Sequence, residues 1–149
     1  MIVILVTALC LAGGVSWLRR TFTLVTVSGE SMLPTLAPGE RVLARRARPA
    51  SLNNGDLVVI RGEIPMPRRQ GHHEDTVGVP CWLIKRVAAL PGDHIAQRRD
   101  AVPEGMVFLL GDNAAHSYDS REAGYFALSH VRGKVVRRLG RHRGDTPAG

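Results

Sequence analysis

The chain has 149 residues, of which 44% are hydrophobic, a size and composition that fit one globular domain. Its formal net charge of +7 comes from 18 arginines and 2 lysines against 13 acidic residues, while aromatic residues make up only 5%. A basic chain without a helix-turn-helix, zinc-finger spacing or aromatic-interleaved basic strands argues against a nucleic-acid partner. Attraction to an anionic lipid surface fits the charge better.

Residues 2–18 contain no charged side chain and are predicted to form an apolar helix. At about 1.5 Å per residue, such a helix is about 26 Å long, slightly short of a hydrocarbon layer of about 30 Å. We therefore predict one transmembrane anchor over residues 1–20. A cleaved signal peptide and a buried core helix remain alternatives, although the run has neither a preceding basic segment nor an amphipathic pattern.

Residues 21–140 have the pattern of short antiparallel strands separated by tight turns. Residues 21–27 alternate polar and apolar side chains and are rich in β-branched residues, which is typical of a strand. The other predicted strands are residues 41–44, 57–60, 81–89, 106–110 and 131–139. We predict a mainly β fold, a compact antiparallel β-sheet domain with one N-terminal transmembrane helix, followed by a flexible tail over 141–149.

The polar loop over residues 64–80 contains two histidines beside two acids, His72, His73, Glu74 and Asp75. Adjacent side chains point apart, and no second cluster in the sequence matches this one. We therefore expect no metal site and no cofactor.

Lys85 and Lys134 stand out because the chain otherwise carries its positive charge as arginine, and only lysine loses its proton near neutral pH. In an extended strand over 81–89, Lys85 shares its face with four apolar side chains, Cys81, Leu83, Val87 and Ala89. Burial there lowers the pKa of an amine, and a fall of about 3 units from about 10.4 produces a base near pH 7. Lys134 is in phase with Arg132 on a polar face, so we predict a solvated charge.

Ser31 lies in the segment SGESMLPT, residues 28–35, directly after the first predicted strand. Its hydroxyl fits two roles, a cap of the turn at Pro34 or a nucleophile activated by a base. Lys85 likewise fits either a general base or a lysine whose stem packs at a strand edge while its amine reaches solvent. Spacing alone decides neither residue.

Four blocks in the chain resemble, in the same order, those of the type I signal peptidases, the membrane-bound Ser/Lys endopeptidases of bacteria and of the mitochondrial inner membrane. The blocks are residues 31–36, 55–59, 85–93 and 111–121 (SMLPTL, GDLVV, KRVAALPGD and GDNAAHSYDSR). With the apolar run ahead of them, they cover nearly the whole chain. Agreement among four ordered blocks favours a nucleophile at Ser31 and a base at Lys85.

The resemblance implies that neutral Lys85 deprotonates Ser31, which then forms an acyl-enzyme that water releases. It also implies that the hydroxyl of Ser117 orients the lysine amine. Three further residues would be structural supports around the site: Asp112, Asp119 and Arg121.

The oxyanion site departs from the pattern of some family members, which place a serine two residues before the nucleophile. Gly29 occupies that position here, and Ser28 precedes it. We therefore expect backbone N–H groups around Ser31 to stabilise the oxyanion, with Ser28 assisting. His116 suggests a Ser/His alternative, which we disfavour because a triad needs a base aimed at the nucleophile, not merely a histidine nearby.

The family cleaves exported precursors after a small-x-small motif and holds the peptide as an added β-strand. Residues 21–28 and 81–84 are the predicted walls of that groove. The resemblance also implies a single-pass protein of the cell membrane with its catalytic domain outside the cytoplasm. Arg19 and Arg20, which follow the apolar run, favour the opposite orientation by the positive-inside rule.

Three other functions remain open from the sequence. The enzyme could be a general signal peptidase or a maturation protease dedicated to one secreted precursor, such as a metalloenzyme or a natural-product leader. A non-enzymatic basic membrane adaptor is the alternative outside enzymes. A cytosolic self-cleaving repressor has a similar Ser/Lys pair, but it should begin with a DNA-binding module in place of the apolar run.

Overall fold

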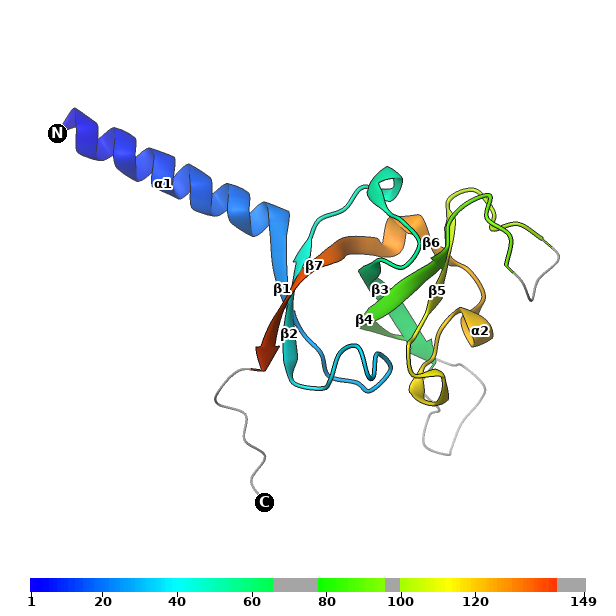
Figure 1. Cartoon of the computed structure of the whole chain (residues 1–149). Helices are drawn as coiled ribbons and strands as arrows, with labels where there is room; N and C mark the ends of the chain where they lie inside the picture. The colour runs from blue at the N-terminus through cyan, green and yellow to red at the C-terminus, as the bar shows by residue number, and fades with distance from the viewer. Residues whose placement is uncertain (66–77, 96–99, 142–149) are drawn as a thin grey trace, which may run out of the picture.

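The computed structural model describes residues 1–65, 78–95 and 100–141. The histidine-containing segment at 72–75 and nearly all of the predicted tail lie outside these ranges. Helix α1, Ile2–Thr21, extends away from the rest of the protein as a single rod (Figure 1). Its described apolar side chains are largely exposed, among them Ile4, Leu11, Val15, Trp17 and Leu18.

The helix expected at the N-terminus is therefore present, and it ends where the β-branched and aromatic residues of the first strand begin. Phe22 at its C-terminal end already has extended dihedral angles. A search of the described part of the chain finds no helix with the length and apolar character required to cross a membrane. The membrane-spanning role of α1 is thus not confirmed.

The domain is a seven-stranded sheet in the order β1-β2-β7-β3-β4-β5-β6, and every pairing in it is antiparallel. The strands are β1 Phe22–Thr26, β2 Glu40–Arg45, β3 Leu57–Pro65, β4 Gly78–Ala89, β5 Met106–Leu110, β6 Phe126–Ala127 and β7 Val131–Arg141. The short helices are α2 Ser120–Ala123 and the 3-10 turns Pro49–Ser51, Ala114–His116 and Leu128–His130. The mainly β antiparallel fold is confirmed.

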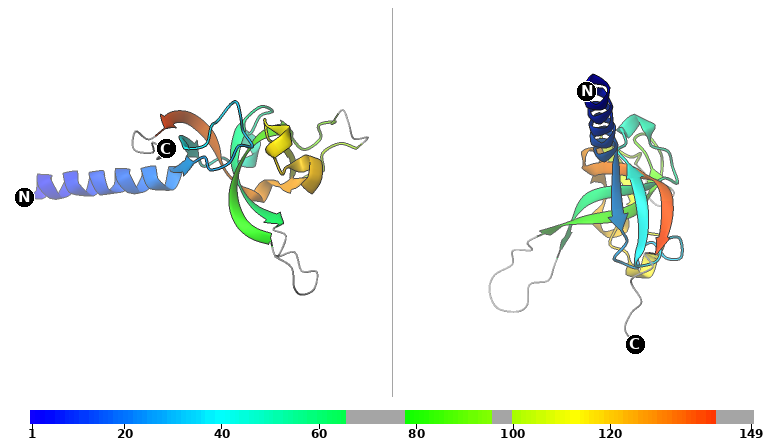
Figure 2. Two further views of the ribbon diagram at one scale, coloured as in Figure 1. Left: turned by 90° about the horizontal axis from the view of Figure 1, so that it is seen from below. Right: turned by 90° about the vertical axis from the view of Figure 1, so that its left-hand side faces the viewer.

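The sheet bends strongly, so that β1, β2 and β7 form one side of the domain and β3, β4 and β5 the other (Figures 1 and 2). Strand β7 joins the two sides by pairing with both β2 and β3, and both pairings contain register shifts. Such bulges increase the local bend of a strand. At Gly133 a Cβ atom would stand 2.8 Å from the carbonyl oxygen of Arg45, so only glycine allows β7 to approach β2 this closely.

Three groups of buried apolar side chains form the core. The first joins β2 and the segment after β1 to β3 and β4, and contains Val27, Met32, Leu36, Val42, Ala44, Val59 and Ile84. The second lies around β3, β4 and β5, with Leu52, Val58, Ile60, Val87, Val107 and Leu109. The third is small and contains Ala89, Val102 and Phe108. Met32 and Leu36 are fully buried, and each contributes about 1.5–3 kcal/mol by leaving water, which fixes the turn that carries Ser31.

Two expectations about individual residues change. Strand parity correctly predicts burial of Lys85, Val87 and Ala89, but Ile84 on the opposite face is buried as well, because the bent sheet covers both faces of β4 here. Lys134 is not simply a solvated charge. Its amine forms an ion pair of 2.7 Å with Asp56, which lies in the turn before β3.

Candidate active site

Lys85 lies in the middle of β4 and has only 1% of its surface exposed. Strand β3 flanks it on one side, where Val58 is its partner in the register. Its Nζ donates a hydrogen bond of 2.8 Å to Oγ of Ser117. A lysine amine that is buried among strands and bonded to a serine hydroxyl is costly to keep charged, because burial removes the water that stabilises the ammonium.

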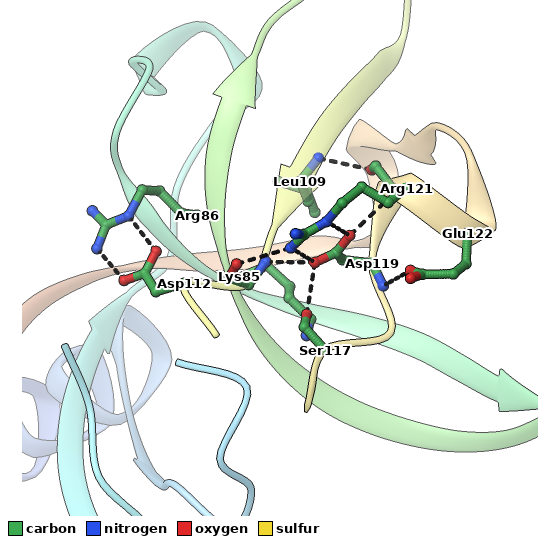
Figure 3. Close-up of polar contacts among 10 residues, drawn as sticks. Lys85, Arg86, Leu109, Asp112, Ser117, Asp119, Arg121 and Glu122 are labelled. Atoms are coloured by element: carbon green, nitrogen blue, oxygen red, sulfur yellow. Dashed lines mark hydrogen bonds and ion pairs between the residues drawn. The ribbon is translucent and has the colours of Figure 1, made fainter. Parts of the chain in front are cut away.

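Ser117 is also buried, and it forms a second hydrogen bond, to Asp119 (Figure 3). Because the hydroxyl of Ser117 donates to Oδ2 of Asp119 at 2.7 Å, its lone pairs are left to accept from Lys85. Asp119 has 0% exposure. The chain of contacts from Lys85 through Ser117 to Asp119 therefore has a fixed direction.

Burial by itself would raise the pKa of Asp119, but hydrogen bonds outweigh it and hold the pKa far below its ordinary range. The guanidinium of Arg121 contacts both carboxylate oxygens, at 2.6 and 2.9 Å. The N–H of Gly111 donates to Oδ2 at 2.8 Å, and Ser117 adds its hydroxyl. Asp119 is thus a permanent buried anion that fixes the orientation of Ser117.

Ser31 is brought beside this cluster by contacts between its turn and the segment after β5. The N–H of Asn113 donates to the carbonyl of Ser31 at 3.0 Å, and Nδ2 of Asn113 donates to the carbonyl of Glu30 at 3.2 Å. Gly111 stands between Ser31 and Ser117, since a Cβ there would lie 2.7 Å from the carbonyl oxygen of Ser31 and 2.6 Å from Cβ of Ser117. Only glycine fits at this position.

Ser31 and Lys85 line the same groove, which has a volume of about 1040 Å³. One wall is made by residues 23–28 of β1 and its continuation, and the opposite wall by residues 82–85 of β4. The two segments predicted as groove walls therefore do face one space. Ser28, Gly29 and His116 line it as well, all three with exposed surface.

The structure thus brings a buried lysine, hydrogen-bonded to Ser117, into a groove that Ser31 also lines. The family model described as "Signal peptidase, peptidase S26" matches residues 1–102 and 96–139. The chain belongs to this family. The resemblance seen in the four sequence blocks is confirmed, and membership supports a serine peptidase of the signal peptidase I type.

Relatives of this signal peptidase family member come from mitochondria, bacteria and plants. The chain is 32% identical to "Mitochondrial inner membrane protease subunit 1" of Schizosaccharomyces pombe, over 81% of this chain and 75% of the relative. It is 26% identical to "Signal peptidase I" of Bacillus caldolyticus, over 76% and 77% of the two chains. It is 35% identical to "Mitochondrial ATP-independent inner membrane protease subunit 1b" of Arabidopsis thaliana, over 74% and 66%.

Asp112 does not join the cluster around Ser117. It forms a two-pronged ion pair with Arg86, at 2.8 and 2.6 Å, on the other side of Lys85 (Figure 3). Hydrogen bonds from Arg86 are the main reason that the pKa of Asp112 lies below its ordinary value. Arg86 also donates to the carbonyl of Gly55 and to the hydroxyl of Thr35. The pair therefore ties the segment after β5 to the Ser31 turn and to the turn before β3.

The sequence predicted Asp112 as a structural support, but it did not predict a role for Arg86. It also missed the cap of α2, where Asp119 accepts from the N–H of Arg121 and Glu122 accepts from the N–H of Asp119. Asp followed by Glu three residues later is a known capping signature, so this feature was readable in the sequence. The long-range partner of Arg86 was not, because 26 residues separate it from Asp112.

Proposed function

We propose that the protein is a membrane-bound serine endopeptidase that removes signal or leader peptides from exported precursors, with Ser31 as nucleophile and Lys85 as general base. The observation that carries this proposal is the burial of Lys85, bonded to Ser117, in the groove that also contains Ser31. Family membership supports the same class of reaction.

The chemistry begins with proton transfer from the hydroxyl of Ser31 to the neutral amine of Lys85. Ser117 accepts a hydrogen bond from that amine and so fixes its orientation. The alkoxide of Ser31 attacks the scissile carbonyl, and Lys85 returns the proton to the leaving amine. In the second half, Lys85 takes a proton from water, the resulting hydroxide attacks the acyl-enzyme, and Lys85 returns the proton to the oxygen of Ser31 as the peptide is released.

The negative charge that develops on the substrate carbonyl needs donors close to the nucleophile. The backbone N–H of Ser31 and those of the adjoining turn supply them in this proposal, assisted by Ser28 at the groove. Gly29 has open space where a Cβ would stand, which leaves the substrate room to approach the backbone. Asp119, Arg121 and Asp112 act indirectly, by holding Ser117 and the turn of Ser31 in place.

The substrates proposed are exported precursors with a small-x-small motif before the cleavage site. An extended peptide fits between β1 and β4 as an added strand, because β1 has a strand neighbour on one side only. A protease dedicated to one secreted precursor would use the same chemistry. A non-enzymatic adaptor would have no use for the buried Lys85–Ser117 bond, so we favour the enzyme.

We further propose that α1 anchors the protein as a single span, with the catalytic domain outside the cytoplasm. Its described apolar side chains are exposed along a helix that leaves the domain, and they need a partner other than water (Figure 1). Two relatives carry the inner membrane in their names. The division into an anchor at 1–20, a catalytic domain at 21–140 and a tail at 141–149 stays a prediction.

The decisive experiment is cleavage of a precursor peptide by the purified full chain and by Ser31→Ala and Lys85→Ala variants. We expect either substitution to lower kcat by at least about 10³-fold, because each removes a group that works only as a pair. Lys134→Ala is the matched control, since it removes the other lysine and only an ion pair with Asp56. The proposal would be contradicted if the Ser31 and Lys85 variants fold normally by circular dichroism and cleave the peptide as fast as the wild-type chain.

A further inference from the structure

Four arginines surround one end of the groove, at the start of β1 and away from Ser31. They come from three elements: Arg19 and Arg20 from the last turn of α1, Arg46 from the residue after β2, and Arg132 from the start of β7. The elements meet there because the N–H of Arg46 donates to the carbonyl of Thr21 and because Gly133 lets β7 approach Arg45. We call these four residues the arginine rim.

The arginine rim has no acidic partner among the residues that the structure describes. Three other described arginines are paired, Arg86 with Asp112, Arg121 with Asp119 and Arg138 with Glu40, whereas Arg45, like the rim, takes part in none of the described ion pairs. The side chains of the rim are all exposed and take part in none of the described ion pairs. Within the described lining, the one acidic residue is Glu30, next to Ser31. The groove is therefore basic at one end and has its single acid at the other.

The geometry of β1 gives the distance between the rim and the reaction. The strand side of the groove runs from Thr23, beside the rim, to Ser28, close to Ser31. At about 3.3 Å per residue, this stretch is about 16 Å long. A peptide paired with β1 therefore places at the rim the residue that lies about four to six positions from its scissile bond.

We propose that the arginine rim selects precursors that carry an acidic residue about four to six positions from the cleavage site. This inference rests on the proposed function, because it assumes that the groove holds a peptide for cleavage by Ser31. Four guanidinium groups with no ion pair among the described residues attract a carboxylate and give directional hydrogen bonds to it. Selection arises because a basic residue at the same substrate position meets like charges.

An anionic lipid headgroup has the same charge as a carboxylate and is the competing occupant. The peptide is favoured because Arg46 and Arg132 line the groove that contains Ser31 and Lys85. Arg45, the last residue of β2, is exposed but does not line that groove. Binding of lipid alone would not require arginines inside the groove that leads to Ser31.

The test uses the full chain in neutral detergent and quenched-fluorescence peptides with an Ala-x-Ala cleavage site. The two peptides of each pair differ only in having Glu or Gln at one position. Across the set, this position varies from three to eight residues from the scissile bond, on either side. We expect kcat/KM for Glu to exceed that for Gln by about fivefold at about four to six positions on one side. The ratio should shrink as salt rises from 50 to 500 mM, because exposed charges are screened.

Three variants identify the source of the selection. Arg46→Gln with Arg132→Gln should bring the Glu-to-Gln ratio close to one. Arg46→Lys with Arg132→Lys should keep most of it, and Arg45→Gln should keep all of it. The ratio compares two substrates of one enzyme, so a general loss of stability in a variant does not change it.

Equal cleavage of Glu and Gln peptides by the wild-type chain at every position would overturn the inference and leave the peptidase intact. So would a preference that survives Arg46→Gln with Arg132→Gln. Binding of phosphatidylglycerol vesicles that depends on Arg46 and Arg132, without selection among peptides, would assign the rim to lipid instead. Cleavage of no peptide at all would overturn the proposed function and the inference together.

Discussion

Lys85 is buried in the strand interior and hydrogen-bonded to Ser117, and its proposed role as a base depends on this loss of contact with water. In the described hydrogen bonds, Ser117 lies between Lys85 and Asp119. A carboxylate in direct contact would stabilise the ammonium and raise the pKa of the amine. The serine spacer therefore keeps the amine oriented without adding a strong reason for it to stay charged.

The first prediction at this scale is a pH profile. The reaction needs the neutral amine, so kcat/KM should rise with pH through an apparent pKa well below about 10.4 and then reach a plateau. A stopped-flow or initial-rate series from pH 5 to 10 measures it. A rate that still climbs at pH 10 would mean that Lys85 is not desolvated in the way proposed.

The second prediction concerns the stability that Asp119 provides. Its pKa is lower in the folded chain than in the unfolded one, so its contribution is complete above about pH 4 and is lost as pH falls further. Asp119→Asn should lower the free energy of unfolding by about 2–3 kcal/mol at pH 7. Urea titrations of both proteins at pH 7 and at pH 3 test this, since the difference should narrow at pH 3. A constant difference would contradict it.

At the scale of residues, sequence reasoning succeeded where a local pattern carried the information. The alternation around Lys85 was enough to predict its burial, because a strand has a strict period of two. It failed for Arg86 and Lys134, whose partners Asp112 and Asp56 come from distant segments. Such pairs depend on how strands are ordered in the sheet, which no single strand reveals.

Strand β5 and the segment after it carry most of the parts that support Lys85. Gly111 closes the strand, gives its N–H to Asp119 and lets Ser31 and Ser117 approach each other across it. The capped helix α2 then turns Ser120 back onto β5, where its hydroxyl accepts from the N–H of Leu109. Eleven residues thus fold back on the end of one strand, which holds Ser117 with little freedom.

The third prediction tests this segment with Gly111→Ala. The added methyl group would collide with Cβ of Ser117 and with the carbonyl of Ser31, so the two must separate. We expect kcat to fall by about 10²-fold, because a shift of about 1 Å at reacting groups costs that much. The thermal midpoint, measured in parallel, should fall too little for unfolding of the variant to explain the loss of kcat. An unchanged kcat would show that Ser31 and Ser117 tolerate the shift.

Among the elements, the strands and α1 were predicted and the short pieces were not. Strands β1 to β5 and β7 show alternation or apolar runs long enough to detect, whereas β6 has two residues and α2 has four. Neither is long enough to complete a period. The bend of the sheet also escaped prediction, because it depends on register shifts between β7 and its two neighbours.

The fourth prediction belongs to the whole molecule and concerns α1. If α1 anchors the protein, the full chain should stay with the membrane pellet after alkaline carbonate extraction. Leu11→Asp with Val15→Asp should release it, because charges in the middle of a span cost about 2.5–3.5 kcal/mol each. Val136→Asp is the control, since this exposed apolar residue lies on β7 outside the helix. Extraction of the wild-type chain by carbonate would contradict a transmembrane anchor.

The position of β1 at one end of the strand order has a consequence for how the protein behaves when no substrate is bound. An uncovered strand edge offers N–H and C=O groups to any extended chain, including another copy of the same protein. Here the arginine rim lies at one end of the edge, so two copies that paired in parallel would bring two sets of like charges together. The charge at this end of β1 therefore disfavours parallel self-association while the strand edge stays open to the proposed peptide.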